Sequence, residues 1–292
     1  MLTNLRRWSG LGPKALQLLK QHKSPTARMD DAMREVCTAA AAKNISLLPA
    51  AEETNTTPTI DAWSLNLQQD YNRQGRSVIY NTYQAYLKST PAQLAKHLSD
   101  AKNEDYTLGI KLVRGAYLGT DLRSAIWPNI ERTHAAYDGI AEALLSKKFM
   151  GLLQPLHGRD AFKYPDINLV LATHNAASVR KAIAIRNKQI AEKQPLVPLA
   201  YAQLQGMADE VSCELIQAGK AVKEERDNEG ENDQVDVPRV FKCTTWGTME
   251  ECLNYLLRRA GENKDAAGRT VVSRTAMGGE VKRRFKGVFG LA

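Results

Sequence analysis

Short apolar segments alternate with longer amphipathic segments along this chain. An apolar run bounded by turn residues is typical of a strand, whereas apolar residues that recur every three or four positions are typical of a helix with one buried face. We predict strands at Met1–Trp8, Asn44–Ala50 and Ser77–Thr82, within Tyr106–Tyr117, and at Ile167–Thr173, Leu196–Ala202 and Arg239–Cys243. We predict helices at Lys14–His22, Met29–Lys43, Asp61–Asn72, Pro91–Asp100, Asn129–Lys147, Ala177–Lys193, Asp209–Gly219 and Met249–Glu262, with a further turn of helix at Tyr83–Leu87.

This order of elements predicts an α/β fold in which neighbouring strands are parallel. An open doubly wound sheet would carry a Gly-x-Gly-x-x-Gly turn after its first strand, and the sequence has none there. We therefore expect a distorted (β/α)8 barrel of the TIM type that forms a single domain over residues 1–292. Because Met1 already lies within a strand, we expect the first barrel strand to be missing. An opened barrel exposes strand edges and core, so we expect poor turnover.

Two charged segments stand out near the end of the chain. Glu224–Asp236 is acidic and has too few apolar residues to pack, so we expect a flexible surface insertion there. Residues 264–292 carry Lys282, Arg283, Arg284 and Lys286, and we expect a basic tail.

Composition and charge narrow the class of protein. The chain is 43% hydrophobic and 25% charged, as in a globular protein, and its four cysteines lack the Cys-x-x-Cys spacing of zinc sites. No apolar run approaches the ~18 residues that cross a bilayer, and no targeting segment is visible. The net charge of +8 is not focused into a patch with aromatic partners, so we expect no nucleic acid partner. An anionic membrane surface or ligand would explain this charge as well.

Polar and charged residues follow several of the predicted strands. In a barrel of alternating strands and helices, the carboxyl ends of the strands meet at one mouth, where ligands bind. The residues concerned are Arg7, Gln84, Lys111, Arg114, Tyr117, Thr173, His174, Asn175, Gln203, Cys243, Thr244 and Thr245. Paired carboxylates do not balance these cations, which indicates an anionic or electron-rich ligand. A His-Glu-x-x-His motif and a carboxylate cluster are both absent from the sequence, so we expect no metal.

Gly115 and two of these positions also have a purely structural interpretation. Gly115 allows either a sharp turn or the close approach of a ligand. His174 can be a buried histidine with satisfied hydrogen bonds, although its place at a strand end favours ligand contact. Gln84 can bond to the backbone or to the edge of a heteroaromatic ring, because an amide both donates and accepts.

Arg258 and Arg259 are neighbours in a predicted helix and so point ~100° apart. One interpretation is an exposed arginine paired with Glu262, a contact worth only a few tenths of a kcal/mol. The other has both guanidinium groups holding one carboxylate, for which the arginine fork is suited. Spacing alone favours the first interpretation.

Four motifs resemble the proline dehydrogenase (proline oxidase) family and occur in the order found there. They are Ile79-Tyr80-Asn81-Thr82-Tyr83-Gln84-Ala85-Tyr86-Leu87-Lys88, Lys111-Leu112-Val113-Arg114-Gly115-Ala116-Tyr117, Ala172-Thr173-His174-Asn175 and Tyr255-Leu256-Leu257-Arg258-Arg259-Ala260. The resemblance runs from about Arg7 to Arg284 and looks most like the fungal mitochondrial enzymes. It implies a distorted β/α barrel that holds FAD and oxidises L-proline to Δ1-pyrroline-5-carboxylate. The electrons pass to a quinone at a membrane surface.

The resemblance also implies roles for individual residues. Arg258 and Arg259 match the pair that binds the proline carboxylate, and Tyr255 and Tyr117 match tyrosines that wall the substrate. Flavin-contacting positions are matched by Gln84, Lys111, Val113, Arg114, Gly115, Thr173 and His174, and Glu262 matches a carboxylate near the arginine pair. The implied location is the mitochondrion.

Four departures from the family pattern bear on activity. Arg7 stands where a substrate-contacting lysine is typical, Ala50 replaces the aspartate of an Asp-Ala-Glu sequence, and Cys243 replaces a tyrosine. The glutamate of the first barrel strand is absent. Two alternatives therefore remain: a non-catalytic relative that binds flavin or a partner, and an unrelated phosphate-binding β/α barrel such as an aldolase.

Overall fold

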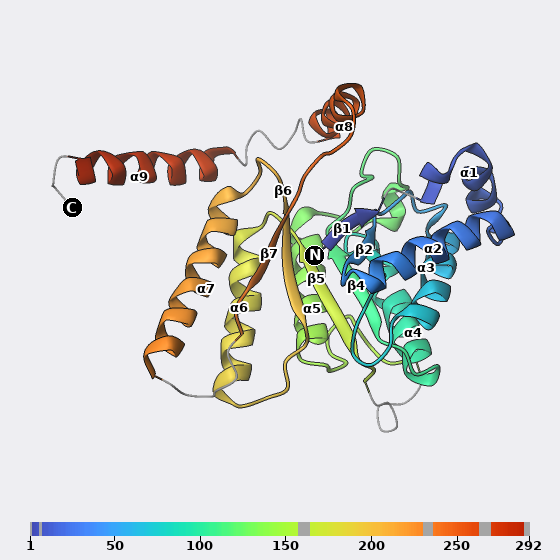
Figure 1. The fold of residues 1–292 in the computed structure, drawn as a ribbon, viewed down its shortest axis with the longest axis horizontal. Coiled ribbons are helices and arrows are strands. Elements are labelled where there is room, and N and C mark those ends of the chain that lie inside the picture. The colour runs from blue at the N-terminus through green and yellow to red at the C-terminus, as the bar shows by residue number, and fades with distance from the viewer. Residues whose placement is uncertain (1, 6–7, 157–163, 230–235, 263–269, 289–292) are drawn as a thin grey trace. The chain divides into compact units, whose positions relative to one another are not determined.

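Helices and strands alternate along the chain, as the sequence predicts (Figure 1). The structure, a computed structural model, describes residues 2–5, 8–156, 164–229, 236–262 and 270–288, with backbone alone at 2–5, 222–229, 258–262, 270–273 and 288. The strands are β1 (Leu2–Leu5), β2 (Ser46–Pro49), β3 (Asn81–Gln84), β4 (Leu108–Val113), β5 (Ile167–Ala172), β6 (Leu199–Leu204) and β7 (Arg239–Cys243). The helices are α1 (Pro13–Lys20), α2 (Ala27–Ala42), α3 (Thr57–Tyr71), α4 (Thr90–Asn103), α5 (Ile130–Leu145), α6 (Ala176–Ala191), α7 (Asp209–Glu229), α8 (Met249–Glu262) and α9 (Thr270–Val288).

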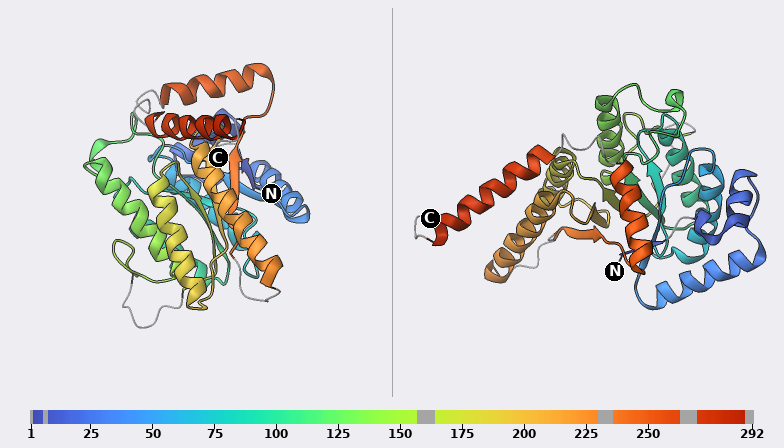
Figure 2. Two further views of the ribbon diagram at one scale, coloured as in Figure 1. Left: turned by 90° about the vertical axis from the view of Figure 1, so that its left-hand side faces the viewer. Right: turned by 90° about the horizontal axis from the view of Figure 1, so that it is seen from above.

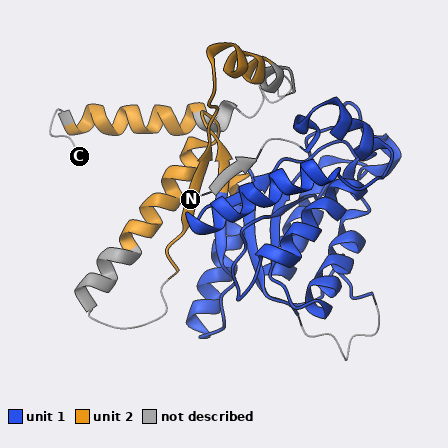
Figure 3. Cartoon of the chain, turned by 45° about the vertical axis from the view of Figure 1, so that its right-hand side comes forward, with its two compact units in different colours: residues 1–173, 177–201 blue, residues 174–176, 202–292 orange. Residues whose placement is uncertain are grey.

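The chain divides into two compact units (Figure 3). Unit 1 comprises Met1–Thr173 and Ala177–Tyr201, and unit 2 comprises His174–Ala176 and Ala202–Ala292. Strand β6 contributes residues to both units. The prediction of one barrel domain over residues 1–292 stays a prediction.

The strands of unit 1 form parallel pairs, which confirms the α/β fold with a parallel sheet. Strand β1 pairs with β2, and β4 pairs with both β3 and β5, in each case in parallel. A single parallel bridge joins Leu47 of β2 to Ile79 just before β3. The helices of unit 1 lie on the outer side of its strands (Figures 1 and 2). In unit 2, the end of β6 is hydrogen-bonded to β7.

Strand β3 begins later than predicted, at Asn81 rather than Ser77. The N–H groups of Ser77, Val78 and Ile79 bond to side chains instead of to a neighbouring strand, whereas the Tyr80 N–H bonds to the Leu47 carbonyl of β2 at 3.0 Å. The Oδ1 atom of Asn72 accepts the N–H groups of Val78 and Ile79 at 2.7 and 3.0 Å, and the Oδ1 atom of Asn168 accepts that of Ser77 at 2.9 Å. The helical turn predicted at Tyr83–Leu87 is wrong for a related reason. Tyr83 and Gln84 belong to β3, and the Ala85 N–H extends the ladder to the carbonyl of Val113.

Helix α7 is longer than predicted and overturns part of the predicted acidic insertion. It continues to Glu229, so residues 224–229 are helical, while 230–235 lie outside the described residues. Low apolar content argues against packing, but it does not stop an existing helix from propagating. Glu224, Glu225, Arg226 and Glu229 are good helix formers, and each added residue gains a backbone hydrogen bond.

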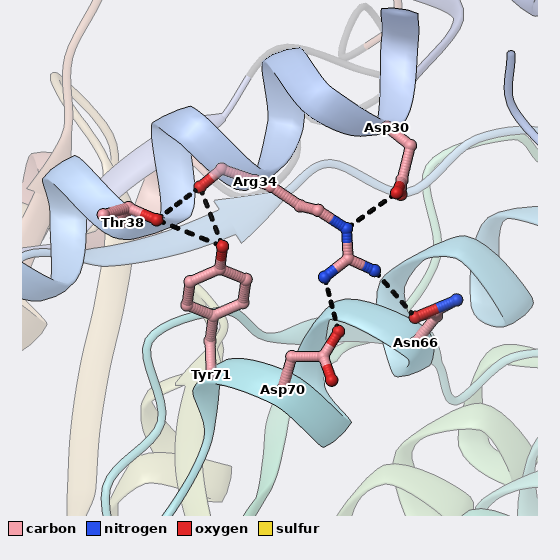
Figure 4. A network of polar contacts seen from close by, with 6 residues as sticks. All are labelled: Asp30, Arg34, Thr38, Asn66, Asp70 and Tyr71. Carbon is pink, nitrogen blue, oxygen red and sulfur yellow. Dashed lines mark hydrogen bonds and ion pairs between the residues drawn. The ribbon is translucent and has the colours of Figure 1, made fainter. Parts of the chain in front are cut away.

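Two helices of unit 1 are joined by a polar cluster around Arg34 of α2 (Figure 4). Its guanidinium donates to Asp30 one turn earlier at 2.7 Å and to Asp70 of α3 at 2.5 Å. The Arg34 carbonyl accepts the hydroxyl groups of Thr38 and Tyr71 at 2.9 and 3.0 Å. Trp8 and Trp63 pack edge to face with ring centroids 5.5 Å apart, in an apolar core that also contains residues of α2, α3 and β2.

The basic tail contains helix α9. Its described side chains from Arg274 onward are exposed except for Glu280, which is half-buried and paired with Arg283 and Arg284 at 2.7 and 2.8 Å.

Two buried titratable groups lie beneath β3. Asp61 of α3 is 4% exposed and accepts hydrogen bonds from the amides of Asn81, at 2.8 Å, and Gln93. His97 of α4 is 6% exposed, and its Nδ1 atom lies 2.9 Å from the Tyr83 hydroxyl. Burial raises the pKa of Asp61 to about 7 and lowers the pKa of His97 to about 4. The two groups therefore oppose each other in the pH dependence of stability.

We expect this opposition to appear when either group is replaced. Between about pH 4 and 7, Asp61 is protonated in the native state and ionised in the unfolded chain. Its contribution to stability therefore falls as pH rises through this range. His97 is neutral in the native state but protonated in the unfolded chain below pH 6.5, so its contribution falls as pH falls. Relative to the native chain, Asp61→Asn should gain about 1.4 kcal/mol of unfolding free energy per pH unit between pH 4.5 and 6.5. Over the same range, His97→Gln should lose about 1.4 kcal/mol of unfolding free energy per pH unit relative to the native chain.

Urea denaturation of the native chain and both variants at pH 4.5, 5.5 and 6.5 would measure these slopes. Because other carboxylates are common to all three chains, they cancel in the differences. A difference that does not vary with pH in either variant would contradict the assignment.

Candidate functional site

The carboxyl ends of β3 and β4 carry several of the residues predicted to contact a cofactor. Side chains alternate between the two faces of a strand. The even-numbered residues of β4 are fully buried, whereas Lys111 and Val113 are half-buried and so lie on the opposite face. In the parallel register, Thr82 pairs with Lys111 and Gln84 with Val113. Gln84, Lys111 and Val113 therefore share one face of the sheet.

The Gln84 amide connects the loops that follow two neighbouring strands. Its Nε2 atom donates to the carbonyl of Glu52 after β2 at 3.2 Å, and its Oε1 atom accepts the N–H of Ala116 after β4 at 3.0 Å. Both ends of the Gln84 amide thus bond to the backbone. Its side chain is buried, and it holds both loops at the end of β3.

Arg114, the first residue after β4, is fixed on all sides of its guanidinium. Its Nε atom donates to Nδ1 of His134 at 3.0 Å, and its two terminal nitrogens donate to the hydroxyl groups of Thr173 and, at 2.7 Å, Ser178. The guanidinium carbon lies 4.2 Å from the centre of the Tyr137 ring, within cation–π distance. Two predicted residues, Arg114 and Thr173, are therefore brought into direct contact.

Tyr117 is held by a cluster of loop residues that we call the tyrosine clasp: Tyr86, Tyr117 and Asp121, with the backbone of Ala51 and Thr54. The Tyr86 hydroxyl donates to Asp121 at 2.5 Å and accepts the Tyr117 N–H at 3.2 Å. Asp121 also accepts the Thr54 N–H at 2.9 Å, and the Tyr117 hydroxyl donates to the Ala51 carbonyl at 2.9 Å. The clasp joins the loops that follow β2, β3 and β4. Burial and the neighbouring Asp121 carboxylate both raise the pKa of Tyr86.

Gly115 has a packing role that the sequence did not reveal. A Cβ atom at this position would lie 2.4–2.6 Å from ring carbons of Tyr86, and its φ is not in the left-handed region. Neither a left-handed turn nor a ligand is needed to explain this glycine. It allows the Tyr86 ring to lie against the backbone.

A small cavity beside Gln84 is lined by the carboxyl groups of Glu52 and Asp61, to which sequence analysis assigned no role. Ala50, Glu52 and Gln84 line it together with Asp61. Ala50 stands where the family pattern has an aspartate, but Glu52 and Asp61 still place carboxyl groups at this edge. Glu52 is itself buried and accepts the Ser9 N–H at 2.9 Å.

Apart from Arg7, the remaining predicted residues belong to unit 2. The Nε2 atom of His174 accepts the Leu204 N–H at 3.0 Å, which leaves the proton of a neutral ring on Nδ1. In α8, positions 255, 258, 259 and 262 follow the i, i+3, i+4, i+7 spacing of a single helix face. Tyr255 is half-buried. The side chains of Arg258, Arg259 and Glu262, and all of Arg7, lie outside the described residues.

Three residues that sequence reasoning missed belong to these contacts: His134, Ser178 and Asp121. His134 and Ser178 sit on amphipathic helices and Asp121 lies in a loop, so nothing in the local pattern distinguishes them. Tyr86 was within a quoted motif, but without an assigned role.

Within the described ranges, no group of three or more His, Cys, Asp and Glu residues is placed to hold a metal ion. Nor does that part of the chain contain a helix that is long and apolar enough to cross a membrane.

Comparison with known proteins places this arrangement in a family. The sequence matches the proline dehydrogenase family over residues 4–271. The chain belongs to this family. Proline dehydrogenase 1, mitochondrial, of Caenorhabditis elegans is 31% identical over 251 residues, covering 83% of this chain and 36% of that protein. Hydroxyproline dehydrogenase of Bos taurus is 30% identical over 260 residues, covering 85% of this chain and 49% of that protein. This family member thus spans between about a third and a half of these relatives.

A solved structure shares the fold. Proline utilization A of Bdellovibrio bacteriovorus, inactivated by N-propargylglycine, superposes with a TM-score of 0.64 at 16% identity, over 89% of this chain and 24% of that one. The α/β fold of this proline dehydrogenase family member is therefore one already known. Its resemblance to the fungal enzymes in particular stays a prediction.

We expect Tyr86→Phe to loosen the tyrosine clasp without unfolding the protein. The phenylalanine ring still packs against Gly115, but Asp121 loses a donor and the Tyr117 N–H loses its acceptor. Hydrogen exchange followed by mass spectrometry should show faster exchange in the peptides that contain residues 51–54 and 115–121. The loss of hydrogen bonds should lower the unfolding free energy by about 1–3 kcal/mol.

Tyr71→Phe is the matched control, because it removes the hydroxyl that contacts Arg34 far from these loops in the sequence. It should leave exchange in both peptides native. Native exchange in Tyr86→Phe as well would show that the clasp does not hold these loops.

Proposed function

We propose that this protein is an FAD-dependent proline dehydrogenase. It oxidises L-proline to Δ1-pyrroline-5-carboxylate, the first step of proline catabolism, and passes the electrons to a quinone at a membrane surface. The observation that carries the proposal is the set of donors and cations at the carboxyl ends of β3, β4 and β5, in a chain of this family. The mitochondrial name of the Caenorhabditis elegans relative supports the same location here.

We place these strands in a distorted (β/α)8 barrel. Parallel pairing of β1 with β2 and of β3, β4 and β5 in succession supports this architecture, as does the likeness to proline utilization A. The missing first strand, and the poor turnover that would follow from it, stay predictions.

The residues at the strand ends fit the chemistry of FAD. Gln84, Lys111, Arg114, Thr173 and His174 supply cationic or hydrogen-bonding groups, as an anionic pyrophosphate and a heteroaromatic ring both require. Val113 and Gly115 would contact the cofactor through their backbone. FAD, when bound, would accept a hydride, which carries the two electrons of the oxidation. The protein's cations stabilise the negative charge that develops during this transfer.

Helix α8 would carry residues that bind the substrate. We assign the proline carboxylate to Arg258 and Arg259, whose positions share a helix face with Tyr255 and Glu262. A guanidinium fork matches two carboxylate oxygens and fixes the orientation of the ring. We assign contacts with the substrate to Tyr117, which is held by the tyrosine clasp, and to Tyr255. Arg7 would take the place of the lysine that is typical at the second barrel strand.

A non-catalytic relative is the main alternative, since several family positions differ. The unrelated phosphate-binding barrel loses its support because the chain belongs to the proline dehydrogenase family. Purified protein supplied with FAD should reduce a dye acceptor in the presence of L-proline, although slowly. Flavin binding without any proline-dependent reduction would favour the non-catalytic relative.

Replacing Arg258 or Arg259 by methionine should raise the proline KM with little change in flavin content. Each arginine lost removes charge-assisted hydrogen bonds, so we expect KM to rise roughly 10- to 100-fold. Steady-state dye reduction over a range of proline concentrations would measure this. Arg284→Met, which changes an exposed arginine of α9, is the control. Native KM values in both Arg258→Met and Arg259→Met would return the pair to the solvent-exposed interpretation.

Cys243 should broaden the choice of substrate. It ends β7, is half-buried, and stands where the family pattern has a much larger tyrosine. Hydroxyproline dehydrogenases are also among the relatives. We expect Cys243→Tyr to increase the ratio of kcat/KM for proline to that for 4-hydroxyproline, while Cys213→Tyr, on the exposed surface of α7, does not. An unchanged ratio in Cys243→Tyr would rule out this role.

A further inference from the structure

The contact between Arg114 and His134 has only one possible direction. An arginine side chain donates hydrogen bonds and accepts none. Because the Arg114 Nε atom lies 3.0 Å from Nδ1 of His134, this ring nitrogen must present a lone pair. The histidine can do so only while it is neutral, with its proton on Nε2. A proton added to Nδ1 would replace the acceptor by a donor and place two cations side by side.

The other groups around Arg114 strengthen this requirement. Ser178 donates its hydroxyl proton to Asp138, and the Nζ atom of Lys181 donates to the same carboxylate at 2.6 Å. With its proton directed at Asp138, the Ser178 oxygen offers a lone pair to Arg114 at 2.7 Å. The guanidinium is thus positioned by three acceptors, His134, Ser178 and Thr173, whose hydrogens must point away from it.

Among the described residues, the charged and titratable groups near this contact include Arg114 after β4, Tyr137 and Asp138 on α5, and Lys181 on α6. Asp138 lies between Lys181 and Arg114, 4.0 Å from the latter. Among these groups His134 is the one whose ordinary titration range lies near neutral pH.

We propose that His134 is a positioning residue for Arg114, and that protonation of its ring displaces the guanidinium and weakens the binding of FAD. The inference rests on the proposed function, in which Arg114 contacts FAD. It gives the site an acid sensitivity that does not depend on catalysis, because the affected step is the binding of the cofactor.

FAD affinity, measured by the quenching of flavin fluorescence at pH 5.5 and pH 8, tests this with two variants. His134→Asn keeps an acceptor close to the place of Nδ1 but cannot be protonated, whereas His134→Leu keeps bulk without an acceptor. At pH 8, His134→Asn should bind FAD as the native chain does, and His134→Leu about tenfold more weakly. At pH 5.5, His134→Asn should bind about tenfold more tightly than the native chain.

His22→Asn is the matched control, because His22 contacts Thr59 away from Arg114 and should leave the affinities native at both pH values. Any titration of His174 is common to all the chains and cancels in their ratios. Native affinity of His134→Leu at pH 8, or equal affinities of His134→Asn and the native chain at pH 5.5, would overturn this inference alone. A native chain that binds no FAD at either pH would overturn the proposed function with it.

Discussion

Parallel pairing of β3, β4 and β5 is the constraint on which the candidate site depends. Parallel strands end at the same edge of a sheet, so strand pairing alone brings residues far apart in the sequence together there. The register then decides which side chains share a face, and it pairs Gln84 with Val113 and Thr82 with Lys111. A shift of one residue would turn Lys111 toward the buried face, where a charge is costly. The apolar residues of β4 thus fix the position of its lysine.

The loops beyond the strand ends need support of their own, because a loop lacks the hydrogen-bond ladder of a strand. Here that support comes from buried polar side chains, chiefly the Gln84 amide and the tyrosine clasp. Arg114 is fixed in a similar way, by acceptors on two helices and at the end of β5. A group that must meet a cofactor is useful only if its position is settled beforehand, and such contacts settle it.

Much of this arrangement could be predicted from the sequence, since the alternation of apolar strands and amphipathic helices is a local signal. The helix at Met249–Glu262 was predicted with the bounds that the structure gives. Strand β3 was placed too early, because the side chains of Asn72 and Asn168 take the amide hydrogens that a strand would share with its neighbour. Helix α7 was ended too early, because poor packing was taken as evidence against a helix. The helical propensity of its residues is enough to extend the helix.

The candidate site shows the same division between local and tertiary information. Lys111, Arg114 and Thr173 could be proposed because they follow apolar strands. His134 could not, because its role depends on a contact across 20 residues that no periodicity records. The packing of Gly115 against the ring of Tyr86 is visible only in three dimensions.

The central claim is that this chain holds FAD where L-proline can reduce it. Anaerobic addition of L-proline to the FAD-loaded protein, followed through the visible absorption of the flavin, tests it without requiring a quinone or rapid turnover. The account predicts that the band bleaches in proportion to added proline and returns when an electron acceptor is admitted. A bound flavin whose band persists in excess proline would contradict it.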